Sequence, residues 1–301
     1  MNNLALLAVA FLAGILLRRT GRFPDSTPIA LNGFVIHVSL PAVTLLHVHR
    51  LQLDRSLVLT ALMPWLFFGA AWVFYKAIGR AAGLKERTIG ALILVTGLGN
   101  TSFVGLPMIE AWYGKEWIGV GVVADQLGSF LVLSTLGILT ATAYSSGATS
   151  PRELARRVVL FPPFQALVVA VLLRPFSYPD VMVSVLQKLA DTLTPLALAS
   201  VGFQLRFRLA EGVARPLGLG LLYKLVLGPA LVALLYVVLL RDGGPVMRVT
   251  IFEAAMAPMI TAGIIAADHD LDPPLVSLLV GVGIPLSFLT LAGWWWILRA
   301  V

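Results

Sequence analysis

The chain has 301 residues, of which 58% are hydrophobic and only 12% charged, and its mean hydropathy is +0.91. Soluble domains carry about 25% charged residues, so this composition excludes a water-soluble protein. The net charge of +7 does not indicate nucleic-acid binding, because the basic residues are scattered between apolar stretches. The absence of cysteine excludes disulfides, thiolate metal sites and cysteine nucleophiles. We expect one integral domain, residues 1–301, in the cell (inner) membrane.

Ten apolar stretches are predicted to cross the membrane as helices, most of them reaching the roughly 20 residues that the hydrocarbon core requires. In chain order they are 3–18, 29–48, 56–79, 87–110, 116–143, 157–174, 180–204, 213–240, 246–267 and 273–298. Thirteen Lys and Arg residues lie in or beside the odd-numbered connections and seven beside the even-numbered ones. Basic residues favour the cytoplasmic side, so we expect the odd connections there and both termini on the non-cytoplasmic side.

The fourth stretch contains a run of helix-breaking residues, 97–107, with three glycines and a proline. Each glycine disfavours helix by roughly 1 kcal/mol, and proline removes a backbone hydrogen bond. Irregular backbone survives at membrane depth only where it is buried in protein or lines a wet cavity. The polar side chains of Asn100, Thr101 and Ser102 in this run therefore form a candidate binding site.

The two halves of the chain show a similar spacing of prolines. Pro41 precedes Pro107 by 66 residues, and Pro195 precedes Pro258 by 63. Five spans in each half would make the halves inverted repeats, which are typical of secondary transporters with a site at mid-membrane. The alternative is that these prolines only kink ordinary helices. The predicted division is repeat one 1–144, linker 145–156 and repeat two 157–301.

Four short segments resemble the auxin efflux carrier family, which includes plant auxin exporters and bacterial permeases proposed for malate and malonate. The segments are 99–107 (GNTSFVGLP), 254–258 (AAMAP), 39–42 (SLPA) and 194–197 (TPLA). The resemblance spans the whole chain. It implies an all-α polytopic protein of ten helices in two inverted five-helix repeats, with broken, crossing helices four and nine. Bile-acid sodium symporters share that architecture.

The resemblance also implies which residues contact substrate: Asn100, Thr101, Pro107 and Pro258 would line the crossing. Plant auxin exporters carry a long cytoplasmic loop between the halves, whereas this chain has only about a dozen residues there. We therefore expect a small carboxylate, or an amino-acid-like compound, rather than auxin. Met256 and Thr261, close to Pro258 in sequence, are further candidates for substrate binding, and Gln126 and Ser129 are weaker ones.

Ionisable side chains inside spans are costly, by about 2.5–3.5 kcal/mol at a helix centre, so each needs a reason. Asp125, near mid-membrane, is either a proton or cation carrier or a hydrogen-bonded structural residue. Glu253, five residues before Pro258, is either a protonation or Na⁺ site at the break or a solvated residue at a helix start. His37 is either a proton relay or a residue hydrogen-bonded within the bundle. Lys224 is expected to snorkel to the headgroups.

The leading hypothesis is a secondary transporter (permease or efflux carrier) for a small organic anion, using alternating access with H⁺ or Na⁺ coupling. One repeat is expected to rock against the other, and Asp125 or Glu253 to change protonation. The alternative is an intramembrane enzyme acting on a lipophilic substrate, with Asp125, His37 and Glu253 as acid–base groups. A third possibility is a non-transporting sensor or assembly subunit.

Motifs of ATP hydrolysis, acyl transfer and zinc proteolysis are absent from the sequence. We therefore expect no enzymatic activity, no catalytic residues, no metal and no cofactor. The expected partners are the substrate anion, H⁺ or Na⁺ and the lipid bilayer, with a homodimer plausible and no nucleic acid.

Overall fold

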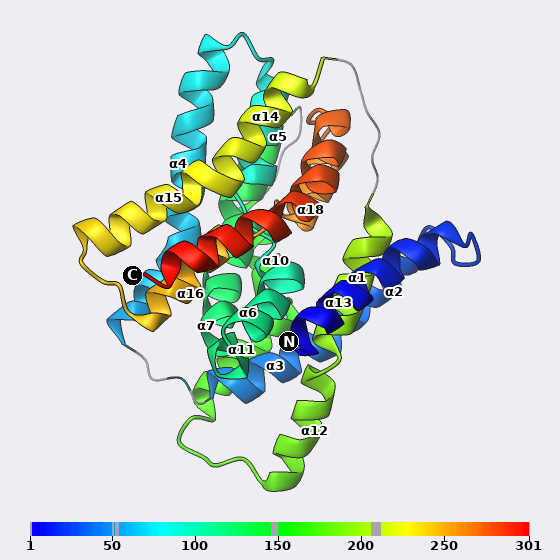
Figure 1. The fold of residues 1–301 in the computed structure, drawn as a ribbon, viewed down its shortest axis with the longest axis vertical. Coiled ribbons are helices and arrows are strands. Elements are labelled where there is room, and N and C mark those ends of the chain that lie inside the picture. Colours follow the sequence, from blue (N-terminus) through cyan, green and yellow to red (C-terminus); the bar gives the residue numbers. More distant parts are fainter. Residues whose placement is uncertain (1, 50, 52–53, 146–149, 206–211, 301) are drawn as a thin grey trace.

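The computed structural model describes residues 2–49, 51, 54–145, 150–205 and 212–300, and within them the chain is helical with no β-strand (Figure 1). Residues 146–149 of the expected linker lie outside this description, as do Arg50, Arg206 and Arg208 of the charge count. Six described helices are long and apolar enough to cross a membrane: Thr27–Val48, Arg55–Ala81, Lys115–Ala143, Asp180–Gln204, Ala214–Leu239 and Pro273–Leu298. The protein is therefore a multi-pass membrane protein.

The helices of the first half follow the expected stretches closely. The first four spans are α1 (Asn2–Arg19); α2 (Thr27–Phe34), continued by η1 (Val35–Ser39) and α3 (Leu40–Val48); α4 (Arg55–Ala81); and α5 (Glu86–Thr96) followed by η2 (Thr101–Gly105) and α6 (Leu106–Trp112). The fifth span is one helix made of η3 (Lys115–Trp117), α7 (Ile118–Val123), η4 (Ala124–Ser129), α8 (Phe130–Val132), η5 (Leu133–Gly137) and α9 (Ile138–Ala143). The fourth expected stretch is broken between α5 and η2, where the glycines lie.

The second half differs from the expectation in one place. Its first four helices are α10 (Pro151–Val159), α11 (Pro162–Leu172), α12 (Asp180–Ala190) and α13 (Leu193–Gln204). A long helix follows, made of α14 (Ala214–Leu222), η6 (Tyr223–Leu227), α15 (Gly228–Ala233) and η7 (Leu234–Leu239). The last three helices are α16 (Pro245–Ala254), α17 (Ile260–Asp268) and α18 (Pro273–Leu298). The expected sixth helix, 157–174, is two helices, because Pro162 and Pro163 start a new helix after α10. The ninth expected stretch is broken between α16 and α17.

Three of the kinks have the same local cause. The π-helical turns η1, η2 and η6 are each followed within two residues by a proline, at Pro41, Pro107 and Pro229. Proline has no backbone N–H and its ring clashes with the preceding turn, and a wider π turn relieves both problems without ending the helix. The prolines therefore bend these helices, and only the glycines of 97–99 and the segment 255–259 accompany a full interruption.

The helices pack in two groups that each combine both halves of the chain. In one group α1 packs on α13, and α11 and α12 pack on α3. A Cβ on Gly14 would lie 2.0 Å from the carbonyl oxygen of Ala199, and one on Gly202 would lie 2.1 Å from that of Phe11, so glycines allow this close approach. The other group contains α4, α5, α14–η7, α16, α17 and α18, with η4 packed on α4 (Figure 1).

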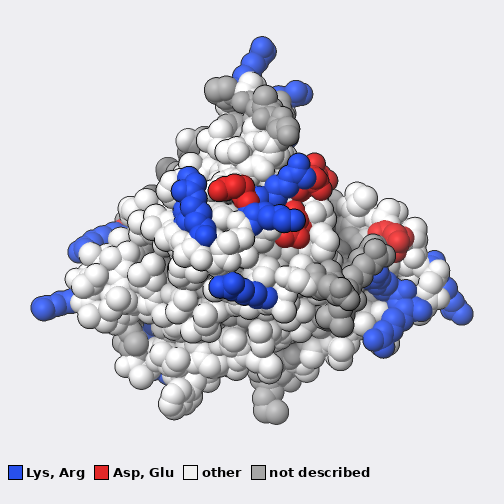
Figure 2. Space-filling model, turned by 90° about the horizontal axis from the view of Figure 1, so that it is seen from above, with Lys and Arg blue, Asp and Glu red and all other residues white. Residues whose placement is uncertain are grey.

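Connections of one parity contact one another. On the odd side Arg87 forms an ion pair with Asp270, and the Thr88 hydroxyl donates to Asp272 at 2.7 Å. On the even side Arg174 donates to the Leu51 carbonyl at 2.6 Å, so the second and sixth connections meet. Figure 2 shows Lys and Arg gathered with acidic residues on the face at the top of Figure 1. Asp270 and Asp272 of the ninth connection thus hold this connection against the start of α5.

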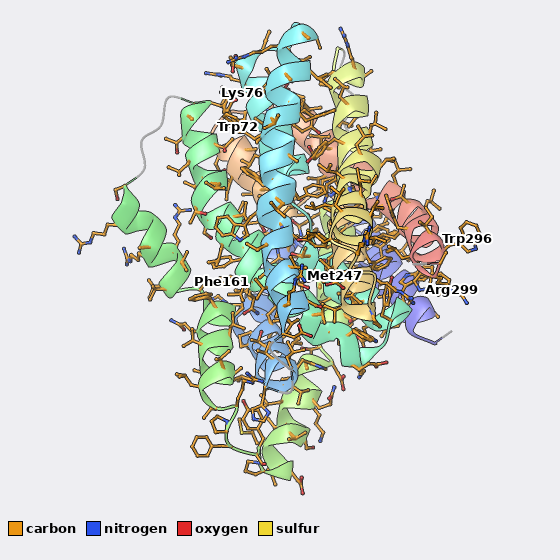
Figure 3. The ribbon with its side chains drawn as sticks, turned by 90° about the vertical axis from the view of Figure 1, so that its left-hand side faces the viewer. Trp72, Lys76, Phe161, Met247, Trp296 and Arg299 are labelled. Carbon is orange, nitrogen blue, oxygen red and sulfur yellow. The ribbon has the colours of Figure 1, made fainter. Side chains whose placement is uncertain are left out.

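Aromatic and basic side chains accompany each other near helix ends, as at membrane interfaces. The Lys76 ammonium lies 4.4 Å from the centroid of the Trp72 ring on α4, and Figure 3 shows both toward one end of that helix. At the end of α18 the Trp296 side chain is 72% exposed beside Arg299. In the same tryptophan run Trp294 turns inward and donates to the Leu225 carbonyl at 2.8 Å.

Candidate binding site at the paired helix interruptions

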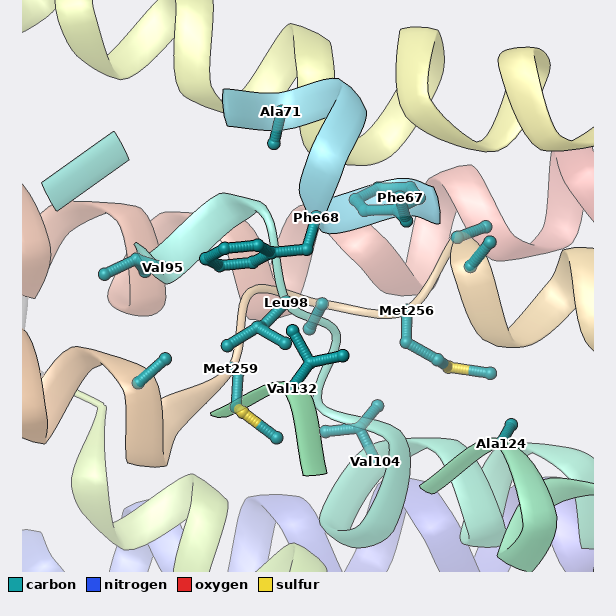
Figure 4. Close-up of a cluster of buried hydrophobic side chains, with 14 of the residues drawn as sticks. Phe67, Phe68, Ala71, Val95, Leu98, Val104, Ala124, Val132, Met256 and Met259 are labelled. Carbon is teal, nitrogen blue, oxygen red and sulfur yellow. The ribbon is translucent and has the colours of Figure 1, made fainter. Parts of the chain in front are cut away.

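The two interruptions meet in the interior. Gly99 and Pro258 form an isolated antiparallel β-bridge, and the backbone N–H of Asn100 donates to the Ala257 carbonyl at 2.9 Å. Buried backbone polar groups that lose their helical partners must find others, and here each break supplies partners for the other. Figure 4 shows the two segments side by side, with Phe68 packed on one side of them and Val104 and Val132 on the other.

Asn100 shapes the restart of the first broken helix. Its Oδ1 accepts from the Phe103 amide at 3.2 Å, as an N-cap residue does, and it satisfies one of the free donors of η2. The side chain is buried, and its Nδ2 donor has no hydrogen-bond partner. An amide N–H₂ group held by its own oxygen and left unpaired in the interior is a ready donor for a ligand.

Asp125 lies beside this restart, on η4. Its Oδ1 accepts hydrogen bonds from the hydroxyls of Thr101, at 2.6 Å, and Ser102. The residue is only 2% exposed, and none of the four ion pairs among the described residues includes it. Two neutral hydroxyls are a weak counterweight to a buried negative charge, so an ionised carboxylate at this position is costly.

A cavity of about 110 Å³ opens onto these groups. Its polar lining consists of Asn32, Asn100, Ser102, Asp125, Gln204 and Thr261. Its apolar lining consists of Ile36, Leu40, Phe103, Phe130, Leu133, Phe161, Met259, Ile260 and Ile264. Gln204 lies on α13 and Asn32 on α2, which packs on α13, whereas Asp125 lies on η4, which packs on α4, so side chains of both helix groups line the cavity. Asn100 and Asp125 form its buried floor, and Thr261 and Ile264 its exposed rim.

The second interruption places charge behind the cavity. Glu253 is 0% exposed and neither of its carboxylate oxygens has a hydrogen-bond partner. The carboxylate fits against two glycines, because a Cβ on Gly105 would lie 2.5 Å from Oε2 and one on Gly121 would lie 3.1 Å from Oε1. Gly121 is one helical turn before Asp125. The Glu253 carboxylate, which comes from α16, therefore packs against the same face of this helix that carries Asp125. The helix-start alternative, with Glu253 in water, is wrong.

Lys224 does not snorkel, contrary to the sequence expectation. It is 1% exposed, and its ammonium donates to the Ala254 carbonyl at 2.9 Å, at the end of α16. The π-helical turn η6 directs the side chain inward from the middle of its helix, too far from either end to reach the headgroups. A lysine in an apolar span is an uncommon signal, but no local pattern indicates that the end of α16 lies beside it.

Four predicted site residues line the cavity together: Asn100, Ser102, Asp125 and Thr261. The other predicted residues lie elsewhere. Thr101 is behind Asp125, Pro258 is in the β-bridge, Met256 is buried beside it, and Pro107 begins α6. His37 is exposed, with its Nδ1 2.9 Å from the Gly33 carbonyl, apart from the cavity.

Among the lining residues that the sequence reasoning missed, four form side-chain contacts that shape the cavity. Asn32 and Gln204 are polar residues in helices of the α1/α13 group, and the Ser200 hydroxyl bonds to both of them, at 2.6 Å to Asn32 and 3.1 Å to Gln204. Phe130 and Phe161 stack with ring centroids 3.8 Å apart and lie on segments of different halves. A polar residue within an apolar span could have identified Asn32, but no local signal pairs the two phenylalanines.

Comparisons with known proteins identify the family of this chain. A family model described as "Membrane transport protein" matches residues 1–295. The chain belongs to this family. It is 27% identical over 290 residues to an uncharacterized transporter of Methanothermobacter thermautotrophicus, covering 95% of this chain and 94% of that protein. It is 23% identical over 316 residues to an uncharacterized transporter of Methanocaldococcus jannaschii, covering 99% and 98%. Membership of a transport family supports a transporter rather than an enzyme.

Proposed function

We propose that this protein is a secondary transporter that moves a small organic anion, a carboxylate, across the membrane by alternating access. The observation that carries this proposal is the cavity between two helix groups whose floor is formed by a helix interruption. A broken helix at membrane depth costs backbone hydrogen bonding, and such breaks occur where they bind a substrate or ion. A scaffold or sensor has no use for two interruptions paired in the interior.

The contacts between helices support inverted repeats. If the ten expected spans are numbered in order, the two-fold axis of an inverted repeat would exchange each of spans one to five with the span five positions later. The packing of α1 on α13, spans one and seven, then corresponds to that of α11 on α3, spans six and two. The bridge between spans four and nine maps onto itself. The packing of η4 on α4, spans five and three, corresponds to that of α18 on α14, spans ten and eight.

The lining favours a carboxylate that binds together with a proton. The Nδ2 donor of Asn100, the Asn32 amide and the hydroxyl of Thr261 can donate to an anion, and Thr261 lies in the first turn of α17, whose dipole favours negative charge. No Lys, Arg or His lines the described cavity. A substrate carboxylate beside an ionised Asp125 would be repelled, whereas a protonated Asp125 can donate to it. Substrate and proton therefore bind together.

The cavity rim lies in the half of the molecule that holds the odd connections, since α17 runs from the break toward the ninth connection. If those connections are cytoplasmic, as the charge bias predicts, this conformation is open inward. The moving bodies in this proposal are the two helix groups, and not the two repeats that the sequence led us to expect. Each helix group contains spans of both repeats, so the groups move relative to each other and carry the cavity from one side to the other.

Binding measurements on purified protein test the proposal. We expect small monocarboxylates to bind more tightly at pH 5 than at pH 7.5, because protonated Asp125 is required. Asp125→Asn, which mimics the neutral form, should bind at both pH values with no pH dependence, and Asp180→Asn, on the exposed start of α12, should behave as wild type. Binding that is independent of pH in the wild type, or unchanged pH dependence in Asp125→Asn, would overturn the coupling.

Transport and orientation are tested with vesicles. Accumulation of unmodified substrate in proteoliposomes is expected, and turnover without accumulation would favour the intramembrane enzyme. Because the chain has no cysteine, single-cysteine variants give no background labelling. We expect Thr261→Cys at the cavity rim to react with an impermeant maleimide from the cytoplasmic side and to be protected by substrate. Val181→Cys, 76% exposed near the start of α12, should react from the opposite side without protection.

A further inference from the structure

The proline of the second interruption leaves one carbonyl without its helical donor. In a continuous helix the Ala254 carbonyl would accept from the N–H of residue 258, but that residue is Pro258 and has none. The structure supplies another donor, the Lys224 ammonium, at 2.9 Å. Carbonyls at the ends of broken membrane helices commonly coordinate a transported or coupling cation, so a tethered ammonium here takes a cation's place.

The surroundings of the ammonium are those of a cation site. The Phe67 ring lies under it, with Nζ 4.3 Å from the ring centroid, which is a cation–π contact. Glu253, the residue before Ala254, interacts with Lys224 electrostatically, and both of its carboxylate oxygens are free of hydrogen bonds. Gly99 borders the site, since a Cβ there would lie 3.3 Å from Nζ. A carbonyl and an aromatic face thus contact this one positive charge, and the Glu253 carboxylate acts on it from beyond ion-pair distance.

We propose that the Lys224 ammonium is a built-in cation at the helix interruption, which takes the place of Na⁺ beside Glu253 and makes the transporter independent of alkali cations. The inference deepens the proposed function and rests on it for the transport measurement, but its stability measurement stands alone. For Glu253 the sequence left open a role with either H⁺ or Na⁺, and this inference excludes Na⁺. The proton at Asp125 is then the coupling ion, and Lys224 supplies a fixed positive charge behind the cavity.

Thermal unfolding of the purified protein, followed by tryptophan fluorescence, tests this inference without any substrate. The wild-type midpoint should be the same in sodium, potassium and choline chloride at equal ionic strength. Lys224→Ala removes the ammonium and leaves a space lined by the Ala254 carbonyl and Glu253. We expect Na⁺ to bind there and to raise the midpoint of this variant by several degrees, because a ligand that binds only the folded state stabilises it.

Controls separate a cation site from a general loss of packing. Lys188→Ala, on the exposed face of α12, should show no sodium dependence, and Lys224→Met, which fills the space with an apolar chain, should also show none. The double variant Lys224→Ala/Glu253→Gln should lose the sodium response of the single variant. If Lys224→Ala does not fold in choline, its recovery by sodium but not by potassium would support the same conclusion.

Two results would overturn the inference. One is a sodium-dependent rise of the wild-type midpoint that Glu253→Gln abolishes, since Na⁺ would then bind despite Lys224. The other is a Lys224→Ala protein that folds with no sodium response. In proteoliposomes the wild type should transport equally with and without sodium. Failure to find any substrate would leave the stability result intact, so the two proposals can fail separately.

Discussion

The two interruptions share a backbone solution but differ in their side chains. At the first, Asn100, Thr101 and Ser102 are polar and surround the Asp125 carboxyl on the cavity floor. At the second, residues 255–258 are apolar, and the ionisable groups, Glu253 and Lys224, lie just behind the break. The first interruption therefore presents hydrogen-bonding groups to the cavity, whereas the second encloses ionisable groups away from the cavity.

The difference shows that a repeated backbone feature can be used for two purposes. Both breaks must satisfy the groups that a continuous helix would satisfy, and they do so partly through the shared bridge between Gly99 and Pro258. The remaining free groups are satisfied differently, by the Asn100 side chain at one break and by the Lys224 ammonium at the other. Substitutions at the two breaks should therefore have separable effects, on ligand binding at the first and on stability at the second.

The largest effect is expected from the second break. Glu253→Gln removes the carboxylate that interacts electrostatically with the buried Lys224 ammonium without a direct ion pair, so the loss should reach at most the about 3–5 kcal/mol that is typical of removing one partner of a buried pair. The free energy of unfolding should fall accordingly in chemical denaturation. The double variant Glu253→Gln/Lys224→Met, which removes both charges, should recover most of the loss. Equal destabilisation by the single and double variants would show that the two residues are not coupled.

A second prediction concerns the space for the Glu253 carboxylate. Gly105→Ala would place a Cβ 2.5 Å from Oε2, and overpacking of this kind typically costs about 1–3 kcal/mol. Gly33→Ala, with nothing within 4 Å of the added Cβ, is the matched control and should gain up to about 1 kcal/mol of helix propensity. Thermal unfolding midpoints in the same detergent compare them. A Gly105→Ala protein as stable as Gly33→Ala would mean that the carboxylate moves freely.

At the first break, binding and stability should separate. Asn100→Asp keeps an oxygen that can accept from the Phe103 amide, but it loses the Nδ2 donor and adds a carboxyl near Asp125. We expect carboxylate affinity to fall about tenfold or more, equivalent to roughly 1.4 kcal/mol, with the cap kept and the unfolding midpoint lowered only by the cost of the added buried carboxyl. Asn100→Ala should lose the affinity and also about 1 kcal/mol of cap stability. Full affinity in Asn100→Asp would exclude the Nδ2 group as a ligand.

The smallest effect is expected at the edge of the cavity, where Phe130 and Phe161 join the two helix groups. An aromatic pair contributes about 0.5–1.5 kcal/mol beyond its buried area, so Phe161→Ala should loosen this contact. Bound substrate should dissociate several-fold faster in stopped-flow measurements, with the pH dependence of binding retained. Phe176→Ala, at a side chain that is 65% exposed, should leave the dissociation rate unchanged. A slower rate in Phe161→Ala would contradict a closing role for the pair.

Local sequence chemistry located the first break and part of the site. Glycines and a proline in 97–107 predicted the interruption, because no neighbouring structure can restore a helix with these residues at low cost. Asn100 and Ser102 followed from their polarity in that run, Asp125 from its charge within a span and Thr261 from its closeness to Pro258, and all four line the cavity. The six long apolar helices follow from the same composition that excludes a soluble protein.

Tertiary contacts decided what composition could not. Lys224 was assigned to the headgroups because a long side chain near a helix end can reach them, and only the packing of η6 against the end of α16 turned it inward. Asn32 and Gln204 become site residues through helix groups that combine distant parts of the chain. His37, a titratable residue in a span, proved to lie on the exposed surface, because hydropathy does not specify which face of an apolar helix is buried.

The sequence by itself determined that this protein is a membrane protein with a broken helix, because hydropathy, glycine and proline act within one segment. Only the tertiary structure decided which groups the breaks bring together, because hydrogen-bond partners of a freed carbonyl or amide come from wherever the chain packs. The Ala254 carbonyl, freed by a proline four residues later, and the ammonium of a lysine thirty positions earlier illustrate both parts.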